Sequence, residues 1–195
     1  FDTIIYDPLM VGYFYLEVVD IYGLKTMGDG KKVSGKIKLW DEEFDIFTDR
    51  IELTNNNLTD SIPSDIKFLT NLYHLSLGYN ELTEIPKEIG TLRKLIHLGL
   101  NNNKFEKLPD EIKYLSNLES LFLYGNNLTG ELNINIQYLN KLNFISISEN
   151  QISGPIPSWI GNLKELRYLD LSKNNFTGEI PLEIFDLNLS GTLGL

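Results

Sequence analysis

The sequence predicts an α/β solenoid in which short coils of nearly equal length stack to form one parallel sheet. Six asparagines recur at separations of 24, 23, 23, 24 and 24 residues: Asn56, Asn80, Asn103, Asn126, Asn150 and Asn174. Each follows a fixed spacing of leucine or isoleucine, as in Leu72–Leu82, and most coils then carry a hydrophobic residue followed by proline. Self-similarity at a period in this range is the sequence signature of a repeat architecture.

Residues 1–47 fall outside this period, and we expect them to cap the open hydrophobic end of the first coil; the alternative is a small separate unit or the end of a preceding one. Within the cap we expect a short helix over about residues 13–22 and a half-buried strand at Ile37 and Leu39. Trp40, which leads into an acidic turn at Asp41–Glu43, is the expected lid over the first coil, because an isolated tryptophan beside a core edge usually packs there.

Residues 48–187 form six repeats, more than the minimum of about three that a solenoid needs. In each repeat an L-x-L core, such as Leu75–Leu77, predicts a short strand that buries its two apolar side chains. The asparagine comes where the chain turns, and its amide both donates and accepts toward backbone groups, so we interpret the asparagines as structural. One helical turn should follow on the convex side. We expect residues 188–195 to be a truncated C-terminal segment.

The fourth repeat departs from the pattern in its second half. Leu132 is followed by Asn133, where the other repeats have proline. Proline fixes an extended bend without leaving a backbone donor to satisfy. We therefore expect a looser outer wall at this repeat.

These features resemble the leucine-rich repeat family over about residues 48–187. Asn174–Pro181 resembles the 24-residue plant-type repeat, whereas the coil beginning at Asn80 is one residue shorter and resembles the type common in intracellular signalling and bacterial proteins. The resemblance implies a right-handed superhelix with a concave parallel sheet, an irregular or short-helical convex side, and use as a protein or peptide recognition surface. Plant ectodomains of this kind usually carry paired cysteines in their caps, and this chain has none.

Composition excludes several classes of partner and site. The net charge is −10, and no basic run extends beyond Lys31–Lys32, so a basic protein suits this surface better than nucleic acid or an anionic membrane. No apolar stretch reaches the roughly 20 residues of a membrane span. The absence of cysteine excludes disulfides, thiolate metal ligands and a cysteine nucleophile, and it favours a reducing compartment such as the cytoplasm.

Side chains between the core leucines should line the concave face, where a partner would bind. Aromatic residues gather in these columns, and exposed aromatics flanked by polar groups form many interface hot spots. The predicted partner-binding residues are Tyr73, His74, Tyr79, His97, Phe122, Tyr124, Phe144, Tyr168 and Asp170. By register, Phe122 falls in a different column from His97 and Phe144. The alternative is that these aromatics merely cover the sheet.

His74 and His97, the only two histidines, share a column in adjacent coils, where strand spacing brings them about 5 Å apart. This placement raises a metal site or a pH switch as interpretations. Two imidazoles alone make a poor zinc site, because zinc usually takes three or four ligands. We therefore expect two solvated histidines and no metal.

Four segments match the N-glycosylation acceptor pattern, at Asn57, Asn127, Asn175 and Asn188. The first three arise from the repeat consensus itself. Together with the plant-type repeats, they leave a secreted or cell-surface location open beside the cytoplasmic one.

No nucleotide-binding, hydrolase or zinc-protease motif is present, so we expect neither catalysis nor a cofactor. The leading hypothesis is a non-catalytic module that binds a protein or peptide, with a basic one favoured, on its concave sheet. One alternative is the sensing portion of a larger receptor or enzyme, since the chain begins at Phe1 and reads as a processed chain or an excerpt. A second alternative is a structural component that associates end to end through its uncapped last coil.

Overall fold

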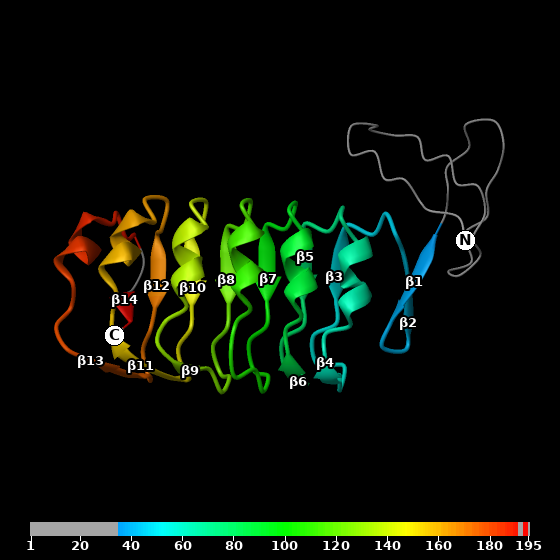
Figure 1. The fold of residues 1–195 in the computed structure, drawn as a ribbon, viewed down its shortest axis with the longest axis horizontal. Helices are drawn as coiled ribbons and strands as arrows, with labels where there is room; N and C mark the ends of the chain where they lie inside the picture. The colour runs from blue at the N-terminus through cyan, green and yellow to red at the C-terminus, as the bar shows by residue number, and fades with distance from the viewer. Residues whose placement is uncertain (1–34, 191–192, 195) are drawn as a thin grey trace.

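The computed structural model describes residues 35–190, 193 and 194, and its coils stack along the long axis of the molecule (Figure 1). Within these residues the main sheet is parallel and has seven strands in the spatial order β14-β12-β10-β8-β7-β5-β3. Its strands are β3 (Arg50–Glu52), β5 (His74–Ser76), β7 (His97–Gly99), β8 (Ser120–Phe122), β10 (Phe144–Ser146), β12 (Tyr168–Asp170) and β14 (Leu193–Gly194). The strands are short because the chain turns away at the asparagine that follows each L-x-L core.

Smaller parallel sheets form where the coils leave the main sheet, except in the third coil. In the described part of the chain, β4 (Thr59–Ser61) pairs with β6 (Glu81–Glu84), and β11 (Gln151–Pro155) lies between β9 (Thr129–Gly130) and β13 (Asn175–Thr177). In the chain these strands come after the turn asparagines and before the 3-10 helices of the outer side.

The outer side of each coil carries one five-residue 3-10 helix, as the proline pattern predicts. These helices are η1 (Ser64–Phe68), η2 (Lys87–Thr91), η3 (Asp110–Tyr114), η4 (Ile134–Tyr138), η5 (Ser158–Asn162) and η6 (Leu182–Asp186). Proline precedes every one except η4, and its fixed φ presents the chain in an extended conformation before the turn begins. Among the described residues, no helix has the length and apolar character to cross a membrane.

Leucine and isoleucine side chains of successive coils form one continuous core between the sheet and the 3-10 helices. Each fully buried side chain of this kind contributes roughly 1.5 to 3 kcal/mol relative to exposure. Because each coil buries its apolar side chains mostly against its neighbours, the array is stable only as a stack. The predicted fold class is therefore the fold of this chain.

Five of the six turn asparagines join their coil to the one before it, which confirms the structural interpretation for these five, whereas Asn56 is exposed and its side chain donates only to the Thr54 carbonyl. Asn103 Nδ2 donates to the carbonyl oxygens of Leu77 at 2.9 Å, in the preceding coil, and Leu100 at 3.2 Å, in its own. Its Oδ1 accepts from the Leu82 N–H at 3.0 Å. The same pattern recurs at Asn80, Asn126, Asn150 and Asn174.

An antiparallel hairpin covers the first coil. It consists of β1 (Lys36–Leu39) and β2 (Glu42–Asp45), and it confirms the predicted strand at Ile37 and Leu39, whose side chains are buried. Trp40 packs against the core, as expected of a lid. The predicted acidic turn is wrong in its extent, because the turn occupies only Trp40 and Asp41 and the glutamates that follow belong to β2. Trp40 adopts φ 54°, which closes this two-residue turn. The helix predicted over residues 13–22 lies outside the described residues.

At the other end, the sheet continues into the segment set apart above as residues 188–195. Strand β14 places Leu193 and Gly194 opposite Leu169 and Asp170 of β12. A Cβ at Gly194 would overlap the Asp170 carboxylate, so glycine suits this close approach.

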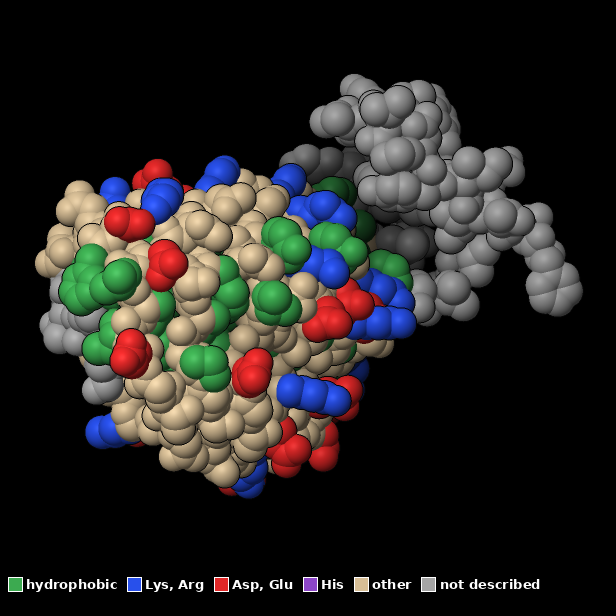
Figure 2. Space-filling view, turned by 60° about the vertical axis from the view of Figure 1, so that its left-hand side comes forward, with side chains coloured by type: hydrophobic (Ala, Val, Ile, Leu, Met, Phe, Trp, Pro, Cys, Tyr) green, Lys and Arg blue, Asp and Glu red, His purple; other side chains and the backbone are tan. Residues whose placement is uncertain are grey.

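The last described coil exposes the apolar side chain before its proline, a position that the earlier coils bury. Ile180 is 45% exposed, whereas its counterpart Ile62 in the first coil is 1% exposed. Leu182 and Phe185 on η6 are also exposed. Figure 2, turned to bring this end of the array forward, shows hydrophobic side chains spread over it with acidic side chains between them.

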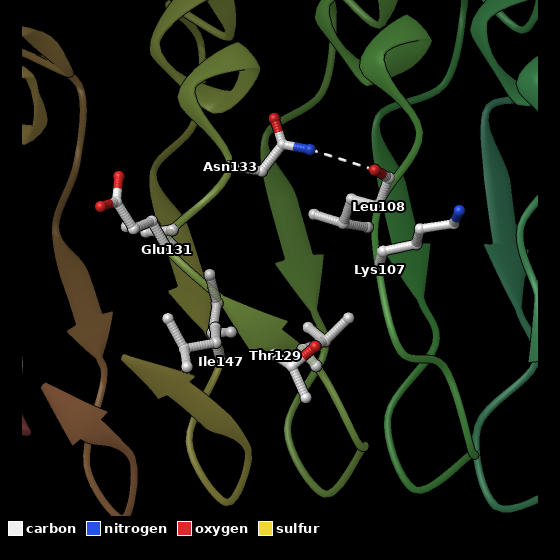
Figure 3. A pocket seen from close by; sticks show the side chains of 9 residues that line it. Lys107, Leu108, Thr129, Glu131, Asn133 and Ile147 are labelled. Carbon is white, nitrogen blue, oxygen red and sulfur yellow. Dashed lines mark hydrogen bonds between the residues drawn. The ribbon is translucent and has the colours of Figure 1, made fainter. Parts of the chain in front are cut away.

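The fourth coil replaces the missing proline with a side-chain cap. Asn133 Oδ1 accepts from the Asn135 N–H at 2.9 Å, and Asn133 Nδ2 donates to the Leu108 carbonyl at 3.1 Å, the bond drawn in Figure 3. A 3-10 helix of the usual length therefore still forms. The outer wall is nevertheless more open here, because η4 packs less closely against η5 than the other neighbouring helices pack. A small recess of about 110 Å³ opens between Lys107 and Glu131, with Leu108 and Ile147 among its apolar lining (Figure 3).

Candidate recognition surface

A ladder of aromatic rings crosses five strands of the concave sheet. His74 and His97 stack with ring centroids 4.2 Å apart and planes 4° apart, and Phe144 and Tyr168 stack at 4.2 Å and 3°. Phe122 joins the two pairs, with its ring centroid 5.1 Å from that of His97 and 4.6 Å from that of Phe144. We call these five residues the ring ladder.

Phe122 enters the ladder from the neighbouring column. In the strand register it lies opposite Gly99 of β7 and Ser146 of β10, while Ser120 occupies the column of His97 and Phe144. The small side chain of Ser120 leaves the space between His97 and Phe144 open, and the Phe122 ring fills it. The column prediction therefore placed Phe122 correctly by register but missed that its ring bridges the two aromatic pairs. The sequence signal for this bridging was Phe122, an aromatic residue two positions after the small Ser120.

The rings are less exposed than predicted, because they cover one another. Phe122, Phe144 and Tyr168 are half-buried, and so are both histidines, which are therefore not the solvated side chains expected from the sequence. Parallel and tilted ring pairs at these distances are favourable by roughly 0.5 to 1.5 kcal/mol beyond the area they bury. The surface they offer a partner consists mainly of ring edges.

The histidine end of the ladder lies beside an ion pair on β3. Arg50 and Glu52 contact each other, and Glu52 Oε1 lies 2.8 Å from His74 Nε2. This last contact is close but poorly aligned for a hydrogen bond, and the buried His74 Nε2 has no other partner. The Glu52 carboxylate therefore acts on His74 through its charge.

Burial lowers the pKa of both histidines below the usual 6.5. For His74, the Arg50 guanidinium lowers the pKa further while Glu52 opposes the change. For His97, the second cause is the neighbouring His74 ring, since charge on one imidazole disfavours charge on the other. Both rings are therefore neutral at pH 7.

A carboxylate marks the other end of the ladder. Asp170 Oδ1 accepts from Ser172 Oγ at 2.6 Å and from the Ser172 N–H at 3.1 Å. Burial acts to raise the pKa of Asp170, but hydrogen bonds from the Ser172 and Ser148 hydroxyls outweigh it and lower the pKa below its usual value. Asp170 is thus a fixed negative charge next to Tyr168.

The other predicted aromatics lie beside the ladder. Tyr73 and Tyr79 are 40% and 54% exposed, and Tyr79 holds a left-handed φ of 56°. Tyr124 is half-buried, and its hydroxyl accepts from Asn101 Nδ2 at 3.0 Å. Burial, with hydrogen bonding to Tyr79, raises the pKa of Tyr124 to about 12. These tyrosines flank the ladder on the concave side but make no ring stack with it.

The remaining predicted sites are surface positions. Among the described residues, no group of three or more His, Cys, Asp or Glu side chains is arranged to hold a metal ion. All four asparagines of the glycosylation patterns have exposed side chains: Asn57, Asn127, Asn175 and Asn188. Their use remains a prediction.

Comparisons with known proteins place this architecture in a family. A model described as "Leucine-rich repeat region" matches residues 87–179, and one described as "Leucine Rich Repeat" matches residues 71–92. The solved structure of pollen receptor kinase 3 is 32% identical, with a TM-score of 0.66, over 86% of this chain and 75% of that one. The chain belongs to the leucine-rich repeat family.

Other solved leucine-rich repeat structures match a similar share of the chain. The ectodomain of the Arabidopsis receptor kinase HAESA, solved with a peptide hormone ligand, is 39% identical with a TM-score of 0.64, over 68% of this chain and 22% of its own. A leucine-rich repeat protein of Leptospira interrogans is 40% identical with a TM-score of 0.62, over 67% of this chain and 33% of its own. This leucine-rich repeat chain spans 20% to 33% of the length of several longer structures that it resembles. A search of curated protein sequences found no match.

Proposed function

We propose that this leucine-rich repeat chain binds an extended peptide segment of a partner protein along its ring ladder. The observation that carries the proposal is the unbroken row of five rings, from His74 to Tyr168, on the concave sheet. Aromatic side chains supply large contact area at low entropic cost, and they are enriched at interface hot spots. The HAESA ectodomain, which this chain resembles, was solved with a peptide ligand.

The size of the ladder sets the length of the segment. Neighbouring strands lie about 4.7 to 4.9 Å apart, so five coils span roughly 20 Å, which an extended chain covers with about six residues. Stacked rings expose their edges rather than their faces, and these edges favour aliphatic side chains and backbone carbonyl oxygens. We therefore infer a segment of about six residues with an apolar centre.

Charge on the concave side favours a basic residue in that segment. The cations of this side already have carboxylate partners, in the pairs Arg50–Glu52, Arg167–Glu165 and Lys173–Glu149. Within the described residues, Asp49, Glu119 and Asp170 form no ion pair, and the Lys173 ammonium that acts on Asp170 is itself paired with Glu149. A lysine or arginine of the ligand would complement Asp170 at the Tyr168 end of the ladder.

Peptide display with the full 195-residue chain tests this function. A library of random hexapeptides is selected on the native chain and on a variant with Phe122→Ala, Tyr124→Ala and Phe144→Ala. We expect binders enriched in apolar and basic residues that lose at least about tenfold in affinity for the variant. Tyr138→Ala, on exposed η4 of the convex side, is the matched control and should leave affinity unchanged. Equal binding to the native chain and the triple variant would refute the site.

The same module fits a sensing role in a larger receptor. Receptor kinases are among the structures that it resembles, and the chain spans only part of the longer ones. The complete reading frame decides this proposal, since a kinase or membrane-spanning segment on the same polypeptide would support it and their absence would refute it.

Self-association is a second candidate, which the exposed Ile180, Leu182 and Phe185 of the last coil favour. In this case two copies would cover each other's apolar ends. Light scattering across a concentration series should show growth in mass that Leu182→Ser with Phe185→Ser abolishes. A chain that stays monomeric at all concentrations would exclude this function.

A further inference from the structure

The stacked histidines are the one part of the ring ladder that can change charge near neutral pH. This chain has no other histidine, and histidine is the side chain whose ordinary pKa lies near neutral pH. His74 and His97 lie face to face at 4.2 Å, and His97 continues the stack to Phe122. A change in the charge or position of these two rings is therefore passed on to Phe122, at the centre of the proposed recognition surface.

Few charged groups face the pair. Strand β3 presents Arg50 and Glu52, which contact each other, and these are the charges that act on the two imidazoles. On the other side, β8 presents Ser120 and Phe122, which are uncharged. Glu52 is the carboxylate of β3 that acts on the pair: it lies 2.8 Å from His74 Nε2, and it favours charge on His97 less than the neighbouring His74 ring opposes it.

Parallel stacking at this distance suits two neutral rings but opposes charge on them. A single imidazolium loses part of its hydration at this half-buried site, which disfavours the charged form. Two imidazolium rings 4.2 Å apart would also repel each other strongly. A Cβ at Gly99 would lie 3.3 Å from His97 Nε2, so the His97 ring leans over the glycine. His97 is only half-buried, so a charged ring can leave the stack through its exposed edge toward water.

We propose that the His74–His97 pair is a proton-operated release element of the concave face. Uptake of one proton by the pair separates the two rings, breaks the ladder at its β5–β7 end and adds positive charge to a surface that otherwise favours a basic segment. This regulation rests on the proposed peptide binding, whereas the ring separation itself does not. Acidification would thus release the ligand.

Nuclear magnetic resonance of the full chain, without ligand, tests the ring separation. We expect both histidines to titrate below pH 6.5, and the ring signals of Phe122 and Phe144 to move with the His97 midpoint. In His74→Gln the pKa of His97 should rise toward its usual value, because the neighbouring imidazole is gone. Histidines that titrate independently near 6.5, with unmoved phenylalanine signals, would overturn the proposal.

A selected hexapeptide without histidine tests the release. We expect its affinity for the native chain to fall about fivefold or more between roughly pH 7.5 and 5.5, and to stay within about twofold in the double variant His74→Gln, His97→Gln. Equal pH dependence in both proteins would refute the release role. If no hexapeptide binds, peptide recognition fails as the function, and the resonance experiment alone decides whether the pair separates.

Discussion

Two ladders of side chains cross the coils of this protein, one inside and one on the concave surface. The asparagine ladder uses one residue type at one position, and it bonds to backbone groups that every coil supplies. The ring ladder mixes histidine, phenylalanine and tyrosine, and it changes column at Phe122. A ladder that bonds to backbone follows the repeat period, whereas one made of side chains alone depends on what each neighbouring coil happens to carry.

The largest loss of stability should come from breaking the asparagine ladder. Asn103→Ala removes the buried partner of the Leu82 N–H and of the Leu77 carbonyl, and we expect a loss of about 3 kcal/mol in the free energy of unfolding. Urea denaturation measures it. Asn56→Ala is the matched control, because Asn56 is exposed and its side chain donates only to the Thr54 carbonyl, so it should cost less than about 1 kcal/mol. Similar losses in the two variants would contradict the structural account.

A smaller loss of stability should come from a substitution in the turn between the two ladders. Gly125 has φ 69°, and a Cβ there would lie 2.6 Å from Asn102 Oδ1. We expect Gly125→Ala to cost about 2 kcal/mol in the free energy of unfolding, from left-handed strain and crowding together. Gly130→Ala has a similar φ of 75° with open space around it, so thermal unfolding should show only the strain, about 1 kcal/mol.

Breaking the ring ladder should lower the stability less than these changes do, but it should weaken peptide binding more. Phe122→Ala removes two ring contacts from a half-buried site, and we expect it to lower the free energy of unfolding by about 1.5 kcal/mol. Near-ultraviolet circular dichroism should change, because the rings of Phe144 and Tyr168 lose an ordered neighbour. Tyr138→Ala on the convex side should change stability by less than about 0.5 kcal/mol. A Phe122→Ala protein with unchanged dichroism would mean that the ladder is not held together by stacking.

The smallest expected effect is a dependence of the free energy of unfolding on pH. Because burial lowers the pKa of both histidines in the folded state, the unfolded chain binds more protons as the pH falls through 6.5. The stabilising contribution is therefore complete above about pH 6.5 and is lost progressively below it. Denaturation at several pH values between 7.5 and 5.5 should show this loss in the native chain and not in the double variant His74→Gln, His97→Gln. A parallel loss in both proteins would assign it to other groups.

The sequence by itself determined the coil. The period of the asparagines, the L-x-L strands and the hydrophobic–proline pairs identify the sheet, the turns and the 3-10 helices, because each is a local pattern that repeats whatever its neighbours are. It also placed all five ladder residues on the concave face, since strand register alone decides which side chains face outward.

Only the tertiary structure decided how those side chains meet. Register separates Phe122 from His97 and Phe144, yet its ring joins them, because Ser120 leaves a space that only the folded stack creates. The histidines are half-buried rather than solvated for the same reason, since the rings of adjacent coils cover them. Side-chain packing between coils depends on the volumes of several residues about 23 or 24 positions apart, and no local pattern in the chain records that fit.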